Sequence, residues 1–183
     1  TMLEMICQTA GSLSEKITLI VGFDKDSIIE NINTFGLDIS TCEQPKPKGT
    51  GDAVMCGIDE VKNESKVLVL YGDVPLIQKE TLINLIDSCE DGLSILTTVL
   101  KEPYGYGRVK KDENGNALSI VEERDATQDE KEIKEIFTGV LCANAVDLKK
   151  GLSEIGNDNA AGEFYLTDIV SIMANKGIKI NTY

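Results

Sequence analysis

The chain has 183 residues and 42% apolar content, which is enough for one ordinary globular domain, residues 1–183, with a sizeable core. Its 18 Lys and Arg and 31 Asp and Glu give a formal net charge of −13, so the overall field repels phosphate backbones and anionic membranes, and we expect neither nucleic acid nor membrane as a partner. The absence of histidine excludes Ser-His-Asp and Cys-His catalysis in their usual forms, which leaves carboxylates, amides and bound metals to carry any chemistry.

The five cysteines predict a reducing compartment. They are odd in number and widely spaced, and they include no Cys-x-x-Cys pair of the kind that binds zinc or does redox work. No apolar run approaches the roughly 20 residues that cross a bilayer, and no basic and apolar leader opens the chain. We therefore expect a cytoplasmic protein.

Apolar periodicity in the first 100 residues predicts helices and strands in alternation. The expected elements are helix 2–10, strand 17–21, a helix capped by Asp26 or Ser27 that carries apolar residues to 35, strand 37–42, helix 52–62, strand 66–70, helix 78–89 and strand 93–99. Such alternation is typical of an α/β fold whose sheet is mainly parallel with right-handed crossovers. The segment 44–51, rich in proline and glycine, is predicted to be a loop that leads into a helix N-terminus.

The second half of the chain departs from this alternation. Strands 106–110 and 117–122 flank the segment 112–116, whose Asn-Gly pair favours an antiparallel hairpin, so the sheet is predicted to be mixed. Thr127 and Glu130 have the spacing of a capping box at a helix N-terminus. The remaining expected elements are helix 128–134, strand 137–143, helix 147–155, helix 166–176 and strand 178–183.

A carboxylate follows strand 66–70 at a position where α/β sheets bind ligands. The apolar run stops at Gly72 and is followed by Asp73. In open α/β sheets the ligand crevice lies just outside the carboxyl ends of buried parallel strands. Asp73 is therefore a candidate ligand of Mg²⁺, which keeps several waters and bridges to substrate phosphates through one or two protein ligands. The alternative is that Asp73 only forms an Asx turn at the strand end.

Four further segments carry groups that suit ligand binding. The loop Gly49-Thr50-Gly51 offers backbone amides at a helix start, although it lacks the spacing of a P-loop or of a dinucleotide-binding motif, and it is equally compatible with an ordinary cap. The segment 105–108 allows close backbone approach to a sugar or forms a plain turn. Glu122 and Glu123 suit sugar hydroxyls or simply face solvent. The segment 163–168 offers ligand contacts at a helix N-terminus, and capping with core packing explains it equally well.

The order of these motifs along the chain resembles that of one protein family. The motifs occupy residues 43–44, 49–54, 71–76, 105–108, 120–123, 125–127 and 162–168. In this order they resemble the N-terminal uridylyltransferase domain of bacterial bifunctional N-acetylglucosamine-1-phosphate uridylyltransferase/glucosamine-1-phosphate acetyltransferase, and the resemblance spans essentially the whole chain.

This resemblance implies a Rossmann-like nucleotidyltransferase fold and a defined reaction. The expected reaction transfers a uridylyl group from UTP to N-acetylglucosamine 1-phosphate and gives pyrophosphate and UDP-N-acetylglucosamine, a precursor of the cell wall. The resemblance further implies that Gln44 and the amides of Gly49 and Thr50 read the uracil, and that Tyr71 and Gly72 line the nucleotide and sugar cleft.

The same resemblance assigns the metal and the sugar. Asp73 is expected to hold Mg²⁺ and to be the catalytic residue, while Glu122 and the backbone of Gly107 are expected to bind the N-acetylglucosamine part. The mechanism expected is in-line attack of a sugar-phosphate oxygen on the α-phosphorus of UTP. Histidine is not required for this chemistry.

The chain departs from the family pattern at its two ends and inside. The family's first strand, with a Gly-rich segment whose Arg and Lys grip the triphosphate, would precede Thr1, so we expect a sheet without this N-terminal strand. An Asn metal ligand and the β-helical acetyltransferase domain, through which the full-length protein is expected to form a homotrimer, would follow Tyr183. Phe137 stands where the family has an Asn that contacts the sugar, and the segment 45–48 also differs from the usual pattern.

Two alternatives therefore stay open. The first is a related sugar-1-phosphate nucleotidyltransferase that uses another sugar or base. The second is a non-catalytic binding or interaction domain, since the phosphate-gripping residues lie outside this sequence. In either case we expect residues 1–183 alone to release little or no pyrophosphate from UTP.

Overall fold

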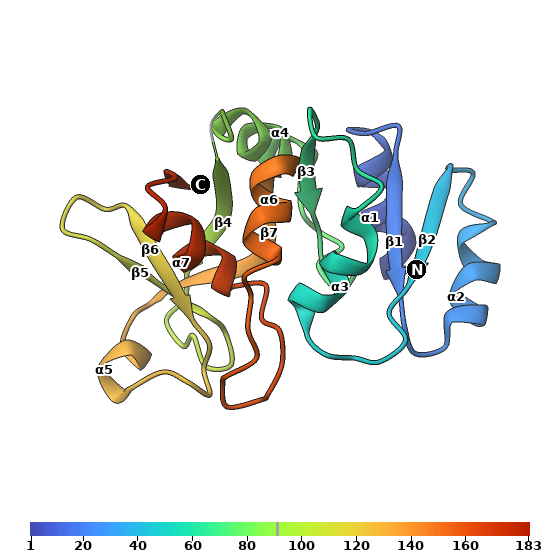
Figure 1. Cartoon of the computed structure of the whole chain (residues 1–183). Helices are drawn as coiled ribbons and strands as arrows, with labels where there is room; N and C mark the ends of the chain where they lie inside the picture. Colours follow the sequence, from blue (N-terminus) through green and yellow to red (C-terminus); the bar gives the residue numbers. More distant parts are fainter. Residues whose placement is uncertain (91) are drawn as a thin grey trace.

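The computed structural model describes residues 1–90 and 92–183, in which helices and strands alternate as expected (Figure 1). The helices are α1 (Met2–Gly11), α2 (Lys25–Ile32), α3 (Thr50–Ile58), α4 (Lys79–Ser88), α5 (Gln128–Lys131), α6 (Ala145–Leu152) and α7 (Asp168–Asn175). The strands are β1 (Ile17–Val21), β2 (Ile39–Glu43), β3 (Lys66–Val69), β4 (Leu93–Val99), β5 (Arg108–Lys111), β6 (Ala117–Val121), β7 (Glu135–Asn144) and β8 (Ile180–Thr182). Within the described residues, no helix is long and apolar enough to span a bilayer.

Some predicted boundaries were wrong, and long-range contacts explain two of them. Helix α3 ends at Ile58 rather than at 62, and the amine of Lys149 donates to the carbonyls of Asp59 and Val61 just beyond it, at 3.4 and 2.6 Å. A lysine so placed satisfies backbone oxygens that a longer helix would otherwise bond internally. Helix α5 ends at Lys131 rather than at 134, and the Lys134 carbonyl accepts the Leu100 N–H at 2.9 Å just before β7 begins at Glu135.

Six strands form the larger sheet, and β7 lies at its centre. On one edge β7 pairs with β4, and on the other it pairs with β3 and β5, each time antiparallel. Strand β8 runs parallel to β4, and β6 runs antiparallel to β5 across the predicted hairpin. It follows that β3, β4, β5 and β8 point in one direction and β6 and β7 in the other. The expectation of a mixed α/β sheet is confirmed, but the expectation that it is mainly parallel was wrong, because in the larger sheet only the β4–β8 ladder is parallel and the other ladders are antiparallel.

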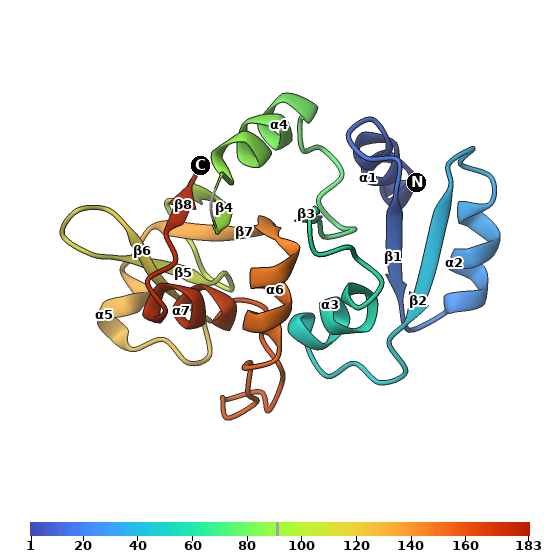
Figure 2. The ribbon, with the colours of Figure 1, turned by 45° about the horizontal axis from the view of Figure 1, so that its top comes forward.

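Strands β1 and β2 form a separate two-stranded parallel sheet. In both views α3 lies between this pair and the larger sheet (Figures 1 and 2). No ladder joins β1 to β3 in the part of the chain that the structure describes. The two sheets are instead linked by apolar packing, in which Leu70 and Ile77 from the β3 side contact a cluster built on Ile6 and Phe35.

Strand β7 is central because its sequence is apolar on both faces. Six of its residues, from Ile136 and Phe137 to Val140–Ala143, are at most 6% exposed. Such two-sided burial is expected of a strand covered on both faces. The main core cluster packs on one face of this strand and includes Leu141, Leu148 and Leu166, while a second cluster around Leu82 and Leu85 of α4 covers the other. Strand β7 is therefore packed on both faces.

Candidate active site

Two segments that are far apart in the sequence form one wall of the candidate site. The carbonyl of Lys48 accepts a hydrogen bond from the Phe164 N–H at 2.8 Å, and the Gly51 N–H donates to the Phe164 carbonyl at 2.8 Å. The Leu166 N–H donates to the Thr50 hydroxyl at 3.0 Å. These three bonds fix the loop before α3 against the segment that leads into α7.

Glycine is required at the start of α3 because the two segments approach closely. Gly49 has φ 115° and ψ 171°, a conformation open almost only to glycine. A Cβ atom there would lie 2.5 Å from the Phe164 carbonyl oxygen, and a Cβ at Gly51 would lie 2.9 Å from the same atom. Gly49 is the N-cap of α3 and makes no side-chain cap bond. Both glycines thus have a packing role in addition to the predicted role of their loop in ligand binding.

The side chain of Gln44 holds the same loop from the other side. Its amide nitrogen donates to the Gly49 carbonyl at 3.1 Å and to Oδ2 of Asp52 at 2.8 Å. Its backbone N–H donates to Val21 at 2.7 Å, which ties the loop to the end of β1. The predicted uracil-reading residues Gln44, Gly49 and Thr50 therefore lie together. Asp52 is a partner that the sequence analysis did not single out.

The residues after β3 combine a packed aromatic ring with an exposed carboxylate. Tyr71 is half-buried, and a Cβ added at Gly139 of β7, where φ is 88°, would lie 2.5 Å from Cδ2 of its ring. Burial raises the pKa of the Tyr71 phenol, a hydrogen bond with Thr50 partly offsets this, and the charges of Glu122 and Asp73 raise the pKa further. Tyr71 therefore shares one electrostatic environment with Thr50, Glu122 and Asp73.

Asp73 is exposed and lies in the turn that follows β3. Among the described residues, no backbone N–H donates to its carboxylate, whereas Asp112 accepts one from Asn114 at 2.9 Å in a true Asx turn. The Asx-turn alternative therefore does not account for Asp73. A free carboxylate is a suitable hard oxygen ligand for Mg²⁺. Residues 1–90 and 92–183 contain no group of three or more His, Cys, Asp and Glu side chains arranged to hold a metal.

The predicted sugar-binding residues also lie together. Gly107 is buried, and a Cβ added to it would lie 2.7 Å from Ile120 and 3.6 Å from both carboxylate oxygens of Glu122. The carboxylate of Glu122 accepts a hydrogen bond from the Thr167 hydroxyl at 2.8 Å, which connects it to the segment before α7. Burial is the main reason why the pKa of Glu122 is raised; the bond from Thr167 lowers it in part, and the charges of Asp168 and Asp125 raise it.

Sequence reasoning missed three positioning roles in this site, although it had named the motifs 49–54 and 162–168. They belong to Asp52, Gly139 and the backbone of Phe164, which position Gln44, Tyr71 and the Gly49 loop, respectively. Gly139 carried a usable signal, because a glycine inside an otherwise apolar strand indicates close approach of another group. The partner roles of Asp52 and Phe164 had no comparable local signal.

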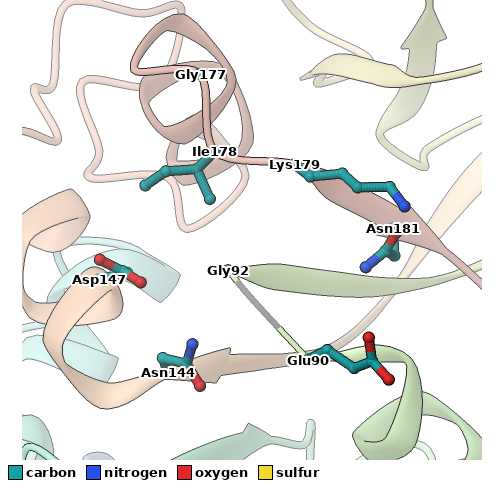
Figure 3. A pocket seen from close by; sticks show the side chains of 8 residues that line it. All are labelled: Glu90, Gly92, Asn144, Asp147, Gly177, Ile178, Lys179 and Asn181. Carbon is teal, nitrogen blue, oxygen red and sulfur yellow. The ribbon is translucent and has the colours of Figure 1, made fainter.

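A separate hollow of about 480 Å³ lies between the starts of β4 and α6 and the end of α7 (Figure 3). It is lined by Glu90, Gly92, Asn144, Asp147, Gly177, Ile178, Lys179 and Asn181. None of these residues belongs to the predicted site. The mixture of acids, amides and one lysine shows no recognisable catalytic pattern, and we assign no function to this hollow.

Solved structures with low sequence identity share the fold. The chain is similar to HddC from Yersinia pseudotuberculosis, with a TM-score of 0.66 and 16% identity, over 100% of this chain and 73% of that one. It is also similar to a UDP-glucose pyrophosphorylase complexed with UDP-glucose, with a TM-score of 0.74 and 15% identity, over 99% of this chain and 78% of that one. These comparisons confirm the predicted Rossmann-like nucleotidyltransferase fold.

Sequence comparisons identify much closer relatives. The chain is 41% identical over 182 residues to the bifunctional protein GlmU of Methylococcus capsulatus and 42% identical over 183 residues to that of Idiomarina loihiensis. These matches cover 98% and 99% of this chain but only 39% and 40% of the relatives, so the chain spans about two fifths of their length. The family model of the MobA-like NTP transferase domain matches residues 1–110. The chain therefore belongs to the MobA-like NTP transferase family and is a nucleotidyltransferase.

Proposed function

We propose that this nucleotidyltransferase transfers the uridylyl group of UTP to N-acetylglucosamine 1-phosphate, with release of pyrophosphate. The observation that carries the proposal is the convergence of the loop before α3, the turn after β3, Glu122 and the segment before α7. These segments lie at the same places in the chain as the motifs that the family resemblance assigns to nucleotide, metal and sugar. The similarity to the bifunctional GlmU proteins supports the same substrates.

In this proposal the nucleotide binds along the wall formed by Gln44, Gly49 and Thr50. Because both N–H groups of the Gln44 amide are already used within the loop, its side-chain oxygen is the group left to accept a hydrogen bond from the base. Tyr71 and Gly72 line the cleft next to this wall. The packing of the Tyr71 ring against Gly139 keeps the ring fixed before the substrates arrive.

The sugar binds between Gly107 and Glu122. The Glu122 carboxylate has one oxygen bonded to Thr167, so its other oxygen remains for sugar hydroxyl groups. Gly107 has no side chain to block the approach of a sugar to its backbone. The Thr167 bond orients the carboxylate before binding, which reduces the entropy lost when the sugar is held.

The reaction forms a bond between a phosphate oxygen of the sugar and the α-phosphorus of UTP, and it breaks the bond from that phosphorus to the pyrophosphate group. Two anions must meet on a chain whose formal charge is −13, so positioning and charge neutralisation dominate. A divalent cation held by Asp73 supplies that neutralisation when bound. In this proposal Gln44 and Glu122 hold the base and the sugar in place, so that the two phosphates can meet.

Exchange of Asp73 for Asn tests the proposal in the full-length protein, assayed by pyrophosphate release with Mg²⁺. We expect turnover to fall by at least about 100-fold. The melting temperature should not change, because Asp73 is exposed. The matched control is Asp38→Asn, which removes another exposed carboxylate, just before β2, and should keep normal turnover. Normal turnover in the Asp73 variant would contradict the metal role.

A different sugar is the second candidate, and Phe137 is the reason. Its N–H donates to the Gly107 carbonyl at 3.0 Å, and its side chain is 6% exposed and packs in the main core. This wall of the sugar subsite therefore offers no side-chain hydrogen bond. An assay against a panel of nucleoside triphosphates and sugar 1-phosphates distinguishes the two candidates, while nucleotide binding without any pyrophosphate release would instead indicate a non-catalytic domain.

The setting of the reaction is also a proposal. We infer a cytoplasmic enzyme of cell-wall precursor synthesis, which agrees with five cysteines that are all free. By the family resemblance, the full-length protein forms homotrimers. Size-exclusion chromatography with light scattering measures that state directly.

A further inference from the structure

One charged side chain is almost completely buried beside the proposed sugar subsite. Arg108, the first residue of β5, is 2% exposed, and it lies opposite Val121 of β6 and Ile136 of β7 in the sheet. A buried guanidinium is costly unless it is paired and hydrogen-bonded. The hydrogen-bond partners of Arg108 should therefore indicate the role of this buried charge.

Arg108 and Glu123 together hold the turn at 105–107 by its backbone. Nη1 of Arg108 donates to the Tyr106 carbonyl, and Nη2 donates to Oε2 of Glu123 at 2.6 Å. The same Glu123 oxygen accepts the Gly105 N–H at 3.2 Å. Gly105 has φ 86°, a left-handed conformation that is only one of several open to glycine. The hydrogen bonds to the Tyr106 carbonyl and from the Gly105 N–H therefore hold the turn in one conformation.

The turn held in this way ends in the sugar subsite. Gly107 follows directly, and its carbonyl accepts the Phe137 N–H at 3.0 Å. Glu123 is also the sequence neighbour of Glu122, the carboxylate that faces Gly107. Two consecutive glutamates just after β6 therefore have different partners, since Glu122 faces Gly107 and Glu123 bonds Arg108 and Gly105. One faces the subsite, and the other fixes the loop that borders it.

The hydrogen bonds of Arg108 argue for positioning more than for stability. A buried ion pair is by itself weak support for stability, since the cost of desolvation offsets much of the attraction. Nε of Arg108 is buried and has no hydrogen-bond partner among residues 1–90 and 92–183. The donors that are satisfied are those that reach the turn and Glu123. We propose that the Arg108–Glu123 pair positions the turn at 105–107 for binding of the sugar 1-phosphate, an inference that rests on the proposed function.

Steady-state kinetics of the full-length protein test the inference with Arg108→Lys and Glu123→Gln. Lysine keeps the charge but not the planar fork of donors, so it cannot bond Tyr106 and Glu123 in the same geometry. We expect Arg108→Lys to raise the KM for N-acetylglucosamine 1-phosphate between about 10- and 100-fold. The KM for UTP and kcat should stay within about twofold, as expected when only binding of one substrate is lost. Glu123→Gln keeps an oxygen for Gly105 and should give a smaller rise, and it carries the test if Arg108→Lys does not fold.

Lys110→Gln is the matched control, because it removes another ion pair of β5, with Glu130 at 2.6 Å, that does not touch the turn. This variant should leave both KM values unchanged. Equal changes in both KM values, or a lower melting temperature without any change in KM, would show that Arg108 and Glu123 are only structural and would overturn the inference. A wild-type protein that turns over no sugar 1-phosphate would overturn the proposed function first, and it is recognised without any variant.

Discussion

Substitution of Gly49 by alanine should separate the two segments that form one wall of the candidate active site. Residue 49 has φ 115° and ψ 171°, and an alanine Cβ would lie 2.5 Å from the Phe164 carbonyl oxygen and 2.9 Å from its nitrogen. These are backbone atoms that cannot rotate away. The two segments must therefore move apart, and the three hydrogen bonds that Phe164 and Leu166 make with residues 48–51 must weaken or break.

The expected cost has two parts. A non-glycine residue in this backbone conformation costs about 1–3 kcal/mol. Loss of three hydrogen bonds at about 0.5–1.5 kcal/mol each adds about 1.5–4.5 kcal/mol. The free energy of unfolding should therefore fall by about 2.5–7.5 kcal/mol, which is a large share of the total of about 5–15 kcal/mol typical of domains.

Urea unfolding followed by circular dichroism measures this cost, with Gly36→Ala as the matched control. Gly36 also has a positive φ of 69°, but no atom lies within 4 Å of an added Cβ. Its substitution should cost only about 1–2 kcal/mol. The difference between the two variants isolates the collision with Phe164. If Gly49→Ala costs no more than Gly36→Ala, the close approach of the two segments is not what holds this wall together.

Three further predictions concern single side chains. Burial raises the pKa of Glu122 above its ordinary 4.5, so the charged form of this side chain destabilises the fold at neutral pH. Glu122→Gln should therefore raise the melting temperature at pH 8 but not below pH 4.5. The same substitution should raise the KM for the sugar phosphate. The pKa of Glu130 is lowered to about 2, chiefly by the bond from Lys110, so its stabilising contribution is present above pH 4.5 and is lost toward pH 2. Glu130→Ala should accordingly cost about 1 kcal/mol in unfolding measurements at pH 7 and almost nothing at pH 2. Phe137→Asn should lower the KM for N-acetylglucosamine 1-phosphate and cost about 3–5 kcal/mol of stability, and an unchanged KM in a folded variant would contradict the proposed sugar contact.

Features that depend on neighbouring residues were predicted well from the sequence. The capping box of Thr127 and Glu130 is present with both of its bonds. The hairpin at 112–116 also forms, with Gly115 at φ 84° and Asp112 accepting from Asn114 and Asn116. Such signals act within four residues of the chain, so no knowledge of the tertiary structure is needed to read them.

The choice of strand partners could not be predicted in the same way. The alternation of helices and strands indicated a parallel arrangement, but it gave no sign that β7 lies antiparallel between β3 and β4. The C-terminal end of α5 could not be predicted from local sequence either. Beyond it, the Lys134 carbonyl accepts the Leu100 N–H at 2.9 Å, a contact across more than 30 residues that draws the chain into the sheet.

For the site, the sequence indicated the residues but not their partners. Gln44 was predicted to bind a base, yet both N–H groups of its side-chain amide hold the loop through Gly49 and Asp52. Glu122 was predicted to contact a sugar, and its bond from Thr167 was not foreseen. In both cases the missing information is a distance between segments that only the folded chain brings together.

The division into two sheets has a consequence for how the protein opens. The β1–β2 pair is joined to the larger sheet by side-chain packing, with no ladder between β1 and β3 in the described ranges, so residues 1–43 can detach without breaking a sheet. Amide protons of β1 should consequently exchange with solvent at a lower free energy than those of β7, which behaves as the last cooperative unit to open. Each such opening presents unsatisfied strand edges, so we expect aggregation or proteolysis of the chain to begin at this seam.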